Sequence, residues 1–111
     1  MVWDGGQPQV GRIFTDKLEG LLGPAREAGE ELSQRHKDIA ASLQALYEEA
    51  FFHLLNAIQA KTGYKVLCLA GGCAMNSVAN GKIFERTPFT DLYVQAAAGD
   101  AGGAIGAAYS V

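Results

Sequence analysis

The chain has 111 residues, enough for one small domain and too few for two. Hydrophobic residues make up 49% of it and charged residues 19%, a balance typical of a globular rather than a disordered protein. The net charge of −3 favours neither a nucleic acid nor an anionic membrane surface as a partner, and no apolar run approaches the ~20 residues of a membrane span.

The first ten residues lack the pattern of a signal peptide, and two cysteines are too few for a disulfide framework. We therefore expect a reducing, cytoplasmic environment. Cys68 and Cys73 flank a glycine pair, but as zinc ligands they lack partners, because His36 and His53 fall in a different predicted element. We expect both cysteines to be small buried side chains instead.

Residues 1–32 predict an irregular lead-in, because glycine and proline recur along it and interrupt any long element. Within it, the apolar residues of Val10–Phe14 predict one short strand. A segment of this length without secondary structure is uncommon inside a compact domain. We therefore expect it to pack across another part of the protein, and residues 33–111 to form the ordered α/β part.

A long helix is predicted for Gln34–Thr62, with Ser33 as its N-cap and Gly63 as the residue that ends it. One apolar stripe has the spacing of three and four residues that marks a single helix face: Ile39, Leu43, Leu46, Ala50, Leu54 and Ile58. Three more apolar residues widen it: Phe51, Phe52 and Leu55. We therefore expect this helix to be buried against more than one neighbour.

Three polar residues of this helix have expected surroundings. We expect His53 to be a core or boundary histidine rather than a metal ligand. We expect Glu48 and Glu49 to belong to a solvated face, as adjacent charges on a helix commonly do.

The stretch Lys65–Ala79 predicts a strand, a tight glycine turn and the start of a helix. The apolar run Val66–Ala70 indicates a strand buried on both faces, as in a parallel sheet, and a helix is predicted over about Cys73–Arg86. Ligands of open α/β sheets bind outside the carboxyl ends of the strands, where glycine permits close approach. Tight packing explains Gly71 and Gly72 as well as a nucleotide contact does, and we expect Gly72 to need a positive φ or a close approach.

A second strand, Leu92–Gln95, implies two parallel strands joined by a right-handed crossover. The last element, Ala101–Tyr109, predicts a helix of small residues. Its three glycines together cost about 3 kcal/mol relative to alanine, so close packing or a ligand must offset them. We expect the glycine-rich turns after the two strands to open on the same edge of the sheet.

Two segments, LCLAGGCAMNSVANGKIF and LYVQAAAGDAGGAIGAA, resemble the carbamoyltransferases of nodulation and antibiotic tailoring, whose pattern is LAGGxAxNxxxNGKI followed by GDAGxAxGAA. LLGPAR and RHKDIAASLQALYEE also fit, so the resemblance covers nearly the whole chain. It implies an actin-like (ribonuclease H-like) fold of two similar domains around a nucleotide cleft. The chain is then an α/β fragment with a small, mainly parallel sheet flanked by helices, and residues 33–111 are a partial actin-like nucleotide-binding domain at the end of the second of those domains.

The resemblance implies ATP-dependent O-carbamoyl transfer, in which carbamoyl phosphate and ATP give a carbamoyl-adenylate that carbamoylates a hydroxyl of a sugar or antibiotic. The family holds a divalent metal ion, such as iron, at the nucleotide phosphates with an HxxxH motif and one aspartate. Asp100 matches that aspartate, whereas the HxxxH motif and the carbamoyl-phosphate pocket are absent from this sequence. We therefore expect no catalytic residue here, and neither a bound cofactor nor activity for the chain alone.

By the same resemblance, Gly71 and Gly72 contact the adenosine side of the nucleotide through backbone atoms, and Asn76 through its side chain. A local helix cap is an open alternative for Asn76. Asp100 has two possible roles, metal ligand and N-cap of the last helix. In the chain alone we expect the N-cap role. Arg26 has a phosphate contact as one interpretation and an ordinary exposed position as the expected one.

Two other functions stay open. The tRNA threonylcarbamoyl-modifying enzymes share an AGGxxxN turn, although the GDAGGAIGAA and NGKI segments favour the carbamoyltransferases. The chain could also be a non-catalytic, stand-alone interaction module. The missing remainder of a parent enzyme is the expected partner, and without it the exposed apolar surface predicts a homodimer or a higher even oligomer.

Overall fold

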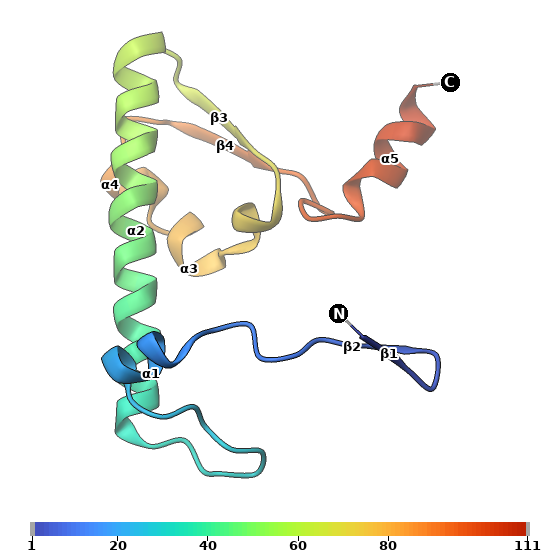
Figure 1. Ribbon diagram of the computed structural model, residues 1–111. Helices are drawn as coiled ribbons and strands as arrows, with labels where there is room; N and C mark the ends of the chain where they lie inside the picture. The colour runs from blue at the N-terminus through green and yellow to red at the C-terminus, as the bar shows by residue number, and fades with distance from the viewer. Residues whose placement is uncertain (1, 111) are drawn as a thin grey trace. The chain divides into compact units, whose positions relative to one another are not determined.

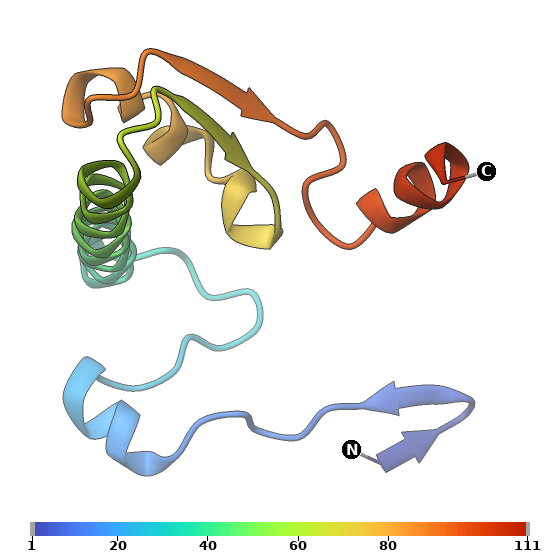
Figure 2. The same ribbon diagram turned by 90° about the horizontal axis from the view of Figure 1, so that it is seen from above.

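The computed structural model describes residues 2–110 and divides into two compact units, Met1–Ser42 and Leu43–Val111. The first unit contains a β-hairpin, a short helix and the beginning of a long helix, and the second contains a two-stranded parallel sheet with helices (Figures 1 and 2). None of the helices in the described part of the chain is long and apolar enough to cross a membrane.

The chain begins with a hairpin that the sequence did not predict. β1 (Val2–Asp4) and β2 (Gln7–Gln9) pair antiparallel. Gly5 and Gly6 join them with φ values of 55° and 81°. Two successive positive φ values are what the tightest hairpin turns require, and glycine adopts them without steric cost. Residues 1–32 are therefore less irregular than predicted.

The predicted strand Val10–Phe14 is wrong, because this segment has no regular secondary structure. Arg12 instead pairs with the carboxylates of Asp16 at 2.5 Å and Glu19 at 2.6 Å. Both acidic residues lie in the first turn of α1 (Asp16–Leu22), another element that the sequence did not predict. The segment thus leads into the N-terminus of α1, where carboxylates are favoured, and does not pair with another strand.

The predicted long helix is confirmed to the residue: α2 spans Gln34–Thr62, and Gly63 follows it with a φ of 71°. The face that α2 buries is not the predicted stripe. Phe52 and Leu55 are each 3% exposed. Four residues of the predicted stripe are 41–66% exposed: Leu43, Leu46, Leu54 and Ile58. The apolar surface of α2 is therefore covered on one side and open on the other within this unit.

The predicted parallel pair is confirmed by β3 (Val66–Leu69) and β4 (Asp91–Val94), which pair with Val66 opposite Asp91. The hydrophobic core lies against one face of this pair and joins α2 to the sheet: Phe52, Leu55, Leu67, Ile83 and Phe89. The expectation that β3 is buried on both faces is wrong within this unit. Leu67 is 9% exposed, but Val66 is 58% exposed and Tyr93 of β4 60%.

The helix predicted over Cys73–Arg86 is broken into three pieces of four residues: η1 (Gly72–Met75), α3 (Ser77–Asn80) and α4 (Ile83–Arg86). The first break lies at Asn76, whose ψ of 88° is not helical. The second break lies at Gly81 and Lys82, directly after Asn80, and asparagine and glycine both have low helix propensity.

The glycine-rich helix at the end of the chain is confirmed with a start one residue later than predicted, as α5 (Gly102–Tyr109). A Cβ atom on Gly102 would lie 2.6 Å from the carbonyl oxygen of Ala97, so close backbone packing explains this glycine. A Cβ atom on Gly103 or Gly106 would have no neighbour within 4 Å. These two glycines leave one side of the helix open.

Candidate functional site

The two glycine-rich turns meet at the carboxyl edge of the sheet, as predicted. The backbone N–H of Gly71, just beyond β3, donates to the carbonyl oxygen of Ala98, beyond β4, at 2.6 Å. Gly71 has a φ of 95°, which only glycine adopts easily. Gly72 has neither a positive φ nor any atom within 4 Å of a Cβ position. The conformational demand that we expected at Gly72 therefore falls on Gly71.

An open cavity of about 450 Å³ lies beside this edge. Its lining comes from the residue after β3, from β4 and the turn after it, and from α5: Ala70, Tyr93, Gln95, Ala97, Ala98, Gly99, Gly102, Gly103, Ile105, Gly106 and Tyr109. The Oε1 atom of Gln95 is buried and has no hydrogen-bond partner. Because this atom is enclosed by the protein, it does not face the open cavity.

Asn76 takes the capping role that the sequence left open. Its Oδ1 atom accepts the backbone N–H of Ala79 at 3.0 Å and so caps α3. Its Nδ2 atom also donates to Oε1 of Gln44 on α2 at 2.9 Å. The side chain is therefore fixed by the protein itself at the first helical segment after the glycine turn.

Asp100 is exposed, in a turn that precedes α5. The expected role as N-cap is wrong: the N-cap is Ala101, whose φ of −74° and ψ of −14° are already helical, and no side chain caps this end. Among residues 2–110, no cluster of three or more histidines, cysteines, aspartates and glutamates could hold a metal ion. Asp100 supplies a single carboxylate beside the cavity-lining turn.

Sequence reasoning missed the polar cluster around Glu48, which we expected in a solvated face. The Glu48 side chain is 8% exposed, and Nζ of Lys82 lies 2.7 Å from each of its carboxylate oxygens. Nε2 of Gln44 donates to the same carboxylate at 3.0 Å, and Arg86 lies 3.5 Å away. The hydrogen bond from Lys82, then that from Gln44, holds the pKa of Glu48 below its usual range. The neighbouring Glu49 is exposed, as expected.

Three further expectations about polar residues are corrected. His53 is exposed rather than in the core or at its boundary. Cys68 and Cys73 are free thiols and exposed rather than buried. The reason is shared: each lies on a side of α2, β3 or η1 that the described residues leave uncovered.

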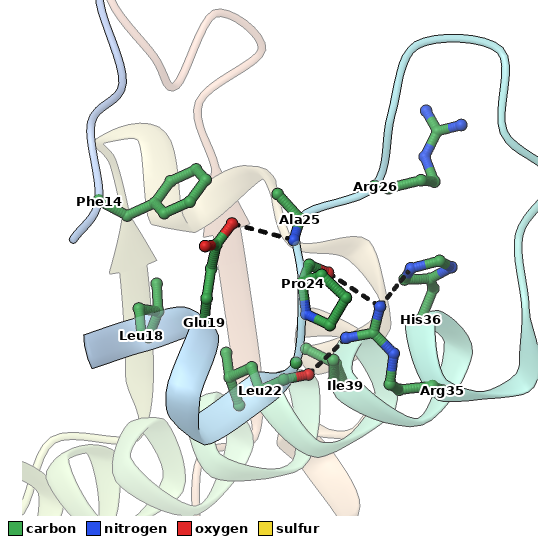
Figure 3. Close-up of a pocket in the computed structure, with 11 residues that line it drawn as sticks. Phe14, Leu18, Glu19, Leu22, Pro24, Ala25, Arg26, Arg35, His36 and Ile39 are labelled. Carbon is green, nitrogen blue, oxygen red and sulfur yellow. Dashed lines mark hydrogen bonds between the residues drawn. The ribbon is translucent and has the colours of Figure 1, made fainter. Parts of the chain in front are cut away.

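A smaller cavity of about 200 Å³ lies in the first unit, where α1 and the start of α2 line it (Figure 3). Arg35 donates from one side of it to the carbonyl oxygens of Leu22 and Pro24. Its guanidinium also lies 3.1 Å from Nε2 of His36. Arg35, a residue of α2, therefore connects α2 to the end of α1 through hydrogen bonds to backbone oxygens.

Arg26 is exposed on the loop after Pro24, as expected (Figure 3). Its guanidinium donates to the carbonyl oxygen of Glu30. The side chain therefore stabilises its own loop. Ser33, the expected N-cap of α2, lies with its hydroxyl 3.1 Å from Nδ1 of His36.

One protein family and several individual proteins are similar to this chain in sequence. The profile of the family described as Carbamoyltransferase N-terminus matches residues 12–109. The nodulation protein NolO of Bradyrhizobium diazoefficiens is 44% identical over 107 residues, which cover 90% of this chain and 19% of the relative. The nodulation protein NolNO of Sinorhizobium fredii is 44% identical over 100 residues, covering 87% of this chain and 15% of the relative.

An uncharacterised protein of Synechocystis is 48% identical over 96 residues, covering 86% of this chain and 16% of the relative. The chain thus spans less than a fifth of the length of the curated relatives it matches. No solved structure matches it significantly.

We expect Gly71→Ala to destabilise the protein by about 1–3 kcal/mol, because alanine is strained at a φ of 95°. Gly72→Ala is the matched control and should change stability by less than about 0.5 kcal/mol, since its site is open and its φ ordinary. Urea unfolding of both variants measures the difference. Equal stability of the two variants would contradict the positive φ at Gly71.

The lowered pKa of Glu48 predicts a pH-dependent contribution to stability. A carboxylate with a lower pKa in the folded than in the unfolded state stabilises the fold above its unfolded pKa of about 4.3. That contribution disappears as the pH falls through the lowered folded value. The melting temperature of Glu48→Gln should therefore lie below that of wild type at pH 7 and approach it at acid pH. Glu49→Gln, the exposed control, should show no such convergence.

Proposed function

The chain belongs to the carbamoyltransferase family, and we propose that it forms part of an ATP-dependent O-carbamoyltransferase with an actin-like fold. In the proposed reaction, a carbamoyl group from carbamoyl phosphate passes through a carbamoyl-adenylate to a hydroxyl group of the acceptor. The observation that carries the proposal is the junction of the two glycine-rich turns, where Gly71 bonds to Ala98 at 2.6 Å beside an open cavity. Ligands of open α/β sheets bind at this edge.

The proposed role of the junction is to contact the nucleotide. Gly71 and Gly72 are both exposed and leave backbone atoms accessible just outside β3. Gly103 and Gly106 leave room along α5 for a ligand, whose contacts would offset the low helix propensity of these residues. Asn76 contributes as a fixed side chain at the start of α3.

Asp100 is proposed as one ligand of the metal ion at the nucleotide phosphates. A carboxylate oxygen suits a divalent cation, and its exposed position leaves it free to bind one. A single carboxylate does not hold a metal ion, and the described residues provide no cluster of ligands. The metal site of the proposed enzyme therefore needs ligands from another part of the protein, and no step of the reaction is assigned to this chain alone.

We expect the purified 111-residue chain to show no carbamoyl transfer, and the chain joined to the missing region of a homologous carbamoyltransferase to show ATP-dependent transfer to a hydroxyl acceptor. The reason is that the chain supplies only part of the nucleotide and metal site. Transfer of radiolabelled carbamoyl groups measures both preparations.

In the joined protein, Asp100→Ala should abolish transfer, and Asp91→Ala serves as the control because Asp91 is an exposed aspartate at the opposite end of β4. Turnover by the chain alone that is lost in Asp100→Ala would overturn the proposed division of the site. A joined protein that folds and binds no ATP would overturn the proposed function.

The partners are proposed from the surface that the second unit leaves uncovered. Leu43 and Leu46 of α2 are 66% and 62% exposed, and Val66 of β3 is 58% exposed. The remainder of the enzyme covers this surface in the proposed complete protein, which is cytoplasmic, in keeping with two free cysteines. For the chain alone, we propose a homodimer that buries the same surface, since exposed apolar patches and open sheet edges favour association.

Light scattering at micromolar concentrations should give twice the 11.7 kDa mass of the chain. Leu46→Glu should shift the protein to the monomer, because a buried unpaired carboxylate disfavours the interface. Glu49→Gln is the matched control on the same helix and should leave the mass unchanged. A wild-type mass of one chain that stays constant across a tenfold range of concentration would exclude the dimer.

A further inference from the structure

Three neighbouring residues of α2 form hydrogen bonds with the segment that follows the glycine turn, and Asn56, further along α2, donates to the carbonyl oxygen of Arg86 at 3.0 Å. The hydroxyl of Tyr47 donates to the carbonyl oxygen of Cys73 at 3.0 Å. Gln44 exchanges hydrogen bonds with the side chain of Asn76 at 2.9 and 3.3 Å. Glu48 binds Lys82 through both carboxylate oxygens. Because residues three and four apart lie on one helix face, these contacts form one row along α2.

The row is continuous from Glu48 to the cap of α3. Glu48 accepts a hydrogen bond from Nε2 of Gln44 at 3.0 Å, and the same nitrogen lies 3.3 Å from Oδ1 of Asn76. That oxygen also accepts the backbone N–H of Ala79. The charge of Glu48 thus fixes the direction of the Gln44 amide, and the Gln44 amide fixes that of Asn76.

The segment held in this way cannot keep its shape unaided. Its helical pieces η1, α3 and α4 have four residues each, far below the length at which an isolated helix is stable in water. Lys82 anchors the second half of the segment to Glu48, and Asn80 ties the first half together by donating to the carbonyl oxygen of Ala74 at 2.7 Å. Contacts with α2 therefore hold the segment at three points: in η1, at the cap of α3 and directly before α4.

We propose that Glu48 is a positioning residue: together with Gln44 and Lys82, it sets the geometry of Gly71, Gly72 and Asn76 from the neighbouring helix. That this turn contacts a nucleotide rests on the proposed function. The pair is partly buried, since the side chain of Glu48 is 8% exposed and that of Lys82 42%. Ion pairs fix the register between neighbouring elements in some proteins, and the proposal assigns this role to Glu48 and Lys82. In the proposal, the carboxylate of Glu48 orients the segment, while the packing of Phe52 and Leu55 holds it against α2.

The test is nuclear magnetic resonance of the 111-residue chain. Glu48→Gln removes the charge while keeping the size of the side chain. We expect it to shift the backbone amide signals of Gly71 and Gly72 and the Nδ2 signals of Asn76, and to raise the hydrogen-exchange rate of the Ala79 amide several-fold. Glu49→Gln, one residue along α2, should leave all of these signals in place.

A second variant guards against a general loss of folding. Gln44→Ala leaves the pair of Glu48 and Lys82 intact but cuts the connection to Asn76, so it should reproduce the changes at Asn76 and Ala79. If neither variant moves these signals, or if the shifts are no larger at the turn than in β4, the positioning role is refuted.

Kinetics of the joined enzyme separate the inference from the proposed function. There, Glu48→Gln should raise the KM for ATP several-fold and change kcat less than the KM, because the turn is displaced while the reacting groups are retained. An unchanged KM would overturn the positioning role for catalysis. A joined wild-type enzyme without ATP dependence would overturn the proposed function, while the resonance shifts would still decide whether Glu48 positions the turn.

Discussion

The second unit depends on the packing of one long helix against segments too short to stand alone. Between β3 and β4 the chain makes three four-residue helical pieces, and α2 contacts them through apolar side chains and through hydrogen bonds. Phe52 packs in the core with Ile83, which is fully buried, and the polar row around Glu48 lies beside it. Apolar burial stabilises the contact between these elements. In the proposal above, the ion pair aligns them and so helps to position the glycine turn at the sheet edge.

The elements that the sequence predicted correctly are those with strong local signals. Periodic apolar residues and Gly63 place α2 to the residue, and short apolar runs place β3 and β4. The broken helix after Gly72 was predicted as continuous because apolar spacing outweighed Asn76 and Gly81 in the pattern. In the structure the Asn76 side chain competes with the helix for backbone N–H groups, which is the mechanism that makes asparagine a cap.

The candidate site was predictable only where its residues are glycines or lie in a motif. Gly71 at the sheet edge follows from strand, turn and helix, whereas the partner of Glu48 does not, since Lys82 is 34 positions away and no local rule joins them. Adjacent glutamates on a helix are read as solvated, and nothing in their spacing separates Glu48 from the exposed Glu49. Membership of the carbamoyltransferase family supplies an interpretation of the motif, and the structure supplies the contacts that hold it.

The apolar residues of α2 fall into two groups, one buried in the core of the second unit and one exposed, and this division explains the exposed stripe. A helix that is apolar over more than half of its circumference needs two neighbours, and the second unit provides one of them through Phe52 and Leu55. Leu43, Leu46 and Leu54 have the spacing of a second buried face, yet all three are more than half exposed. The chain spans less than a fifth of the length of its relatives, and in the proposed enzyme the remainder supplies the second neighbour of α2. The outer face of β3 and β4, open at Val66 and Tyr93, has the same explanation.

The uncovered surfaces of α2 and of the sheet are both apolar. The sheet leads into the two glycine-rich turns, and α2 contacts the segment that follows the first of them. The proposed enzyme therefore needs its remainder both for the missing ligands and for the second side of this core.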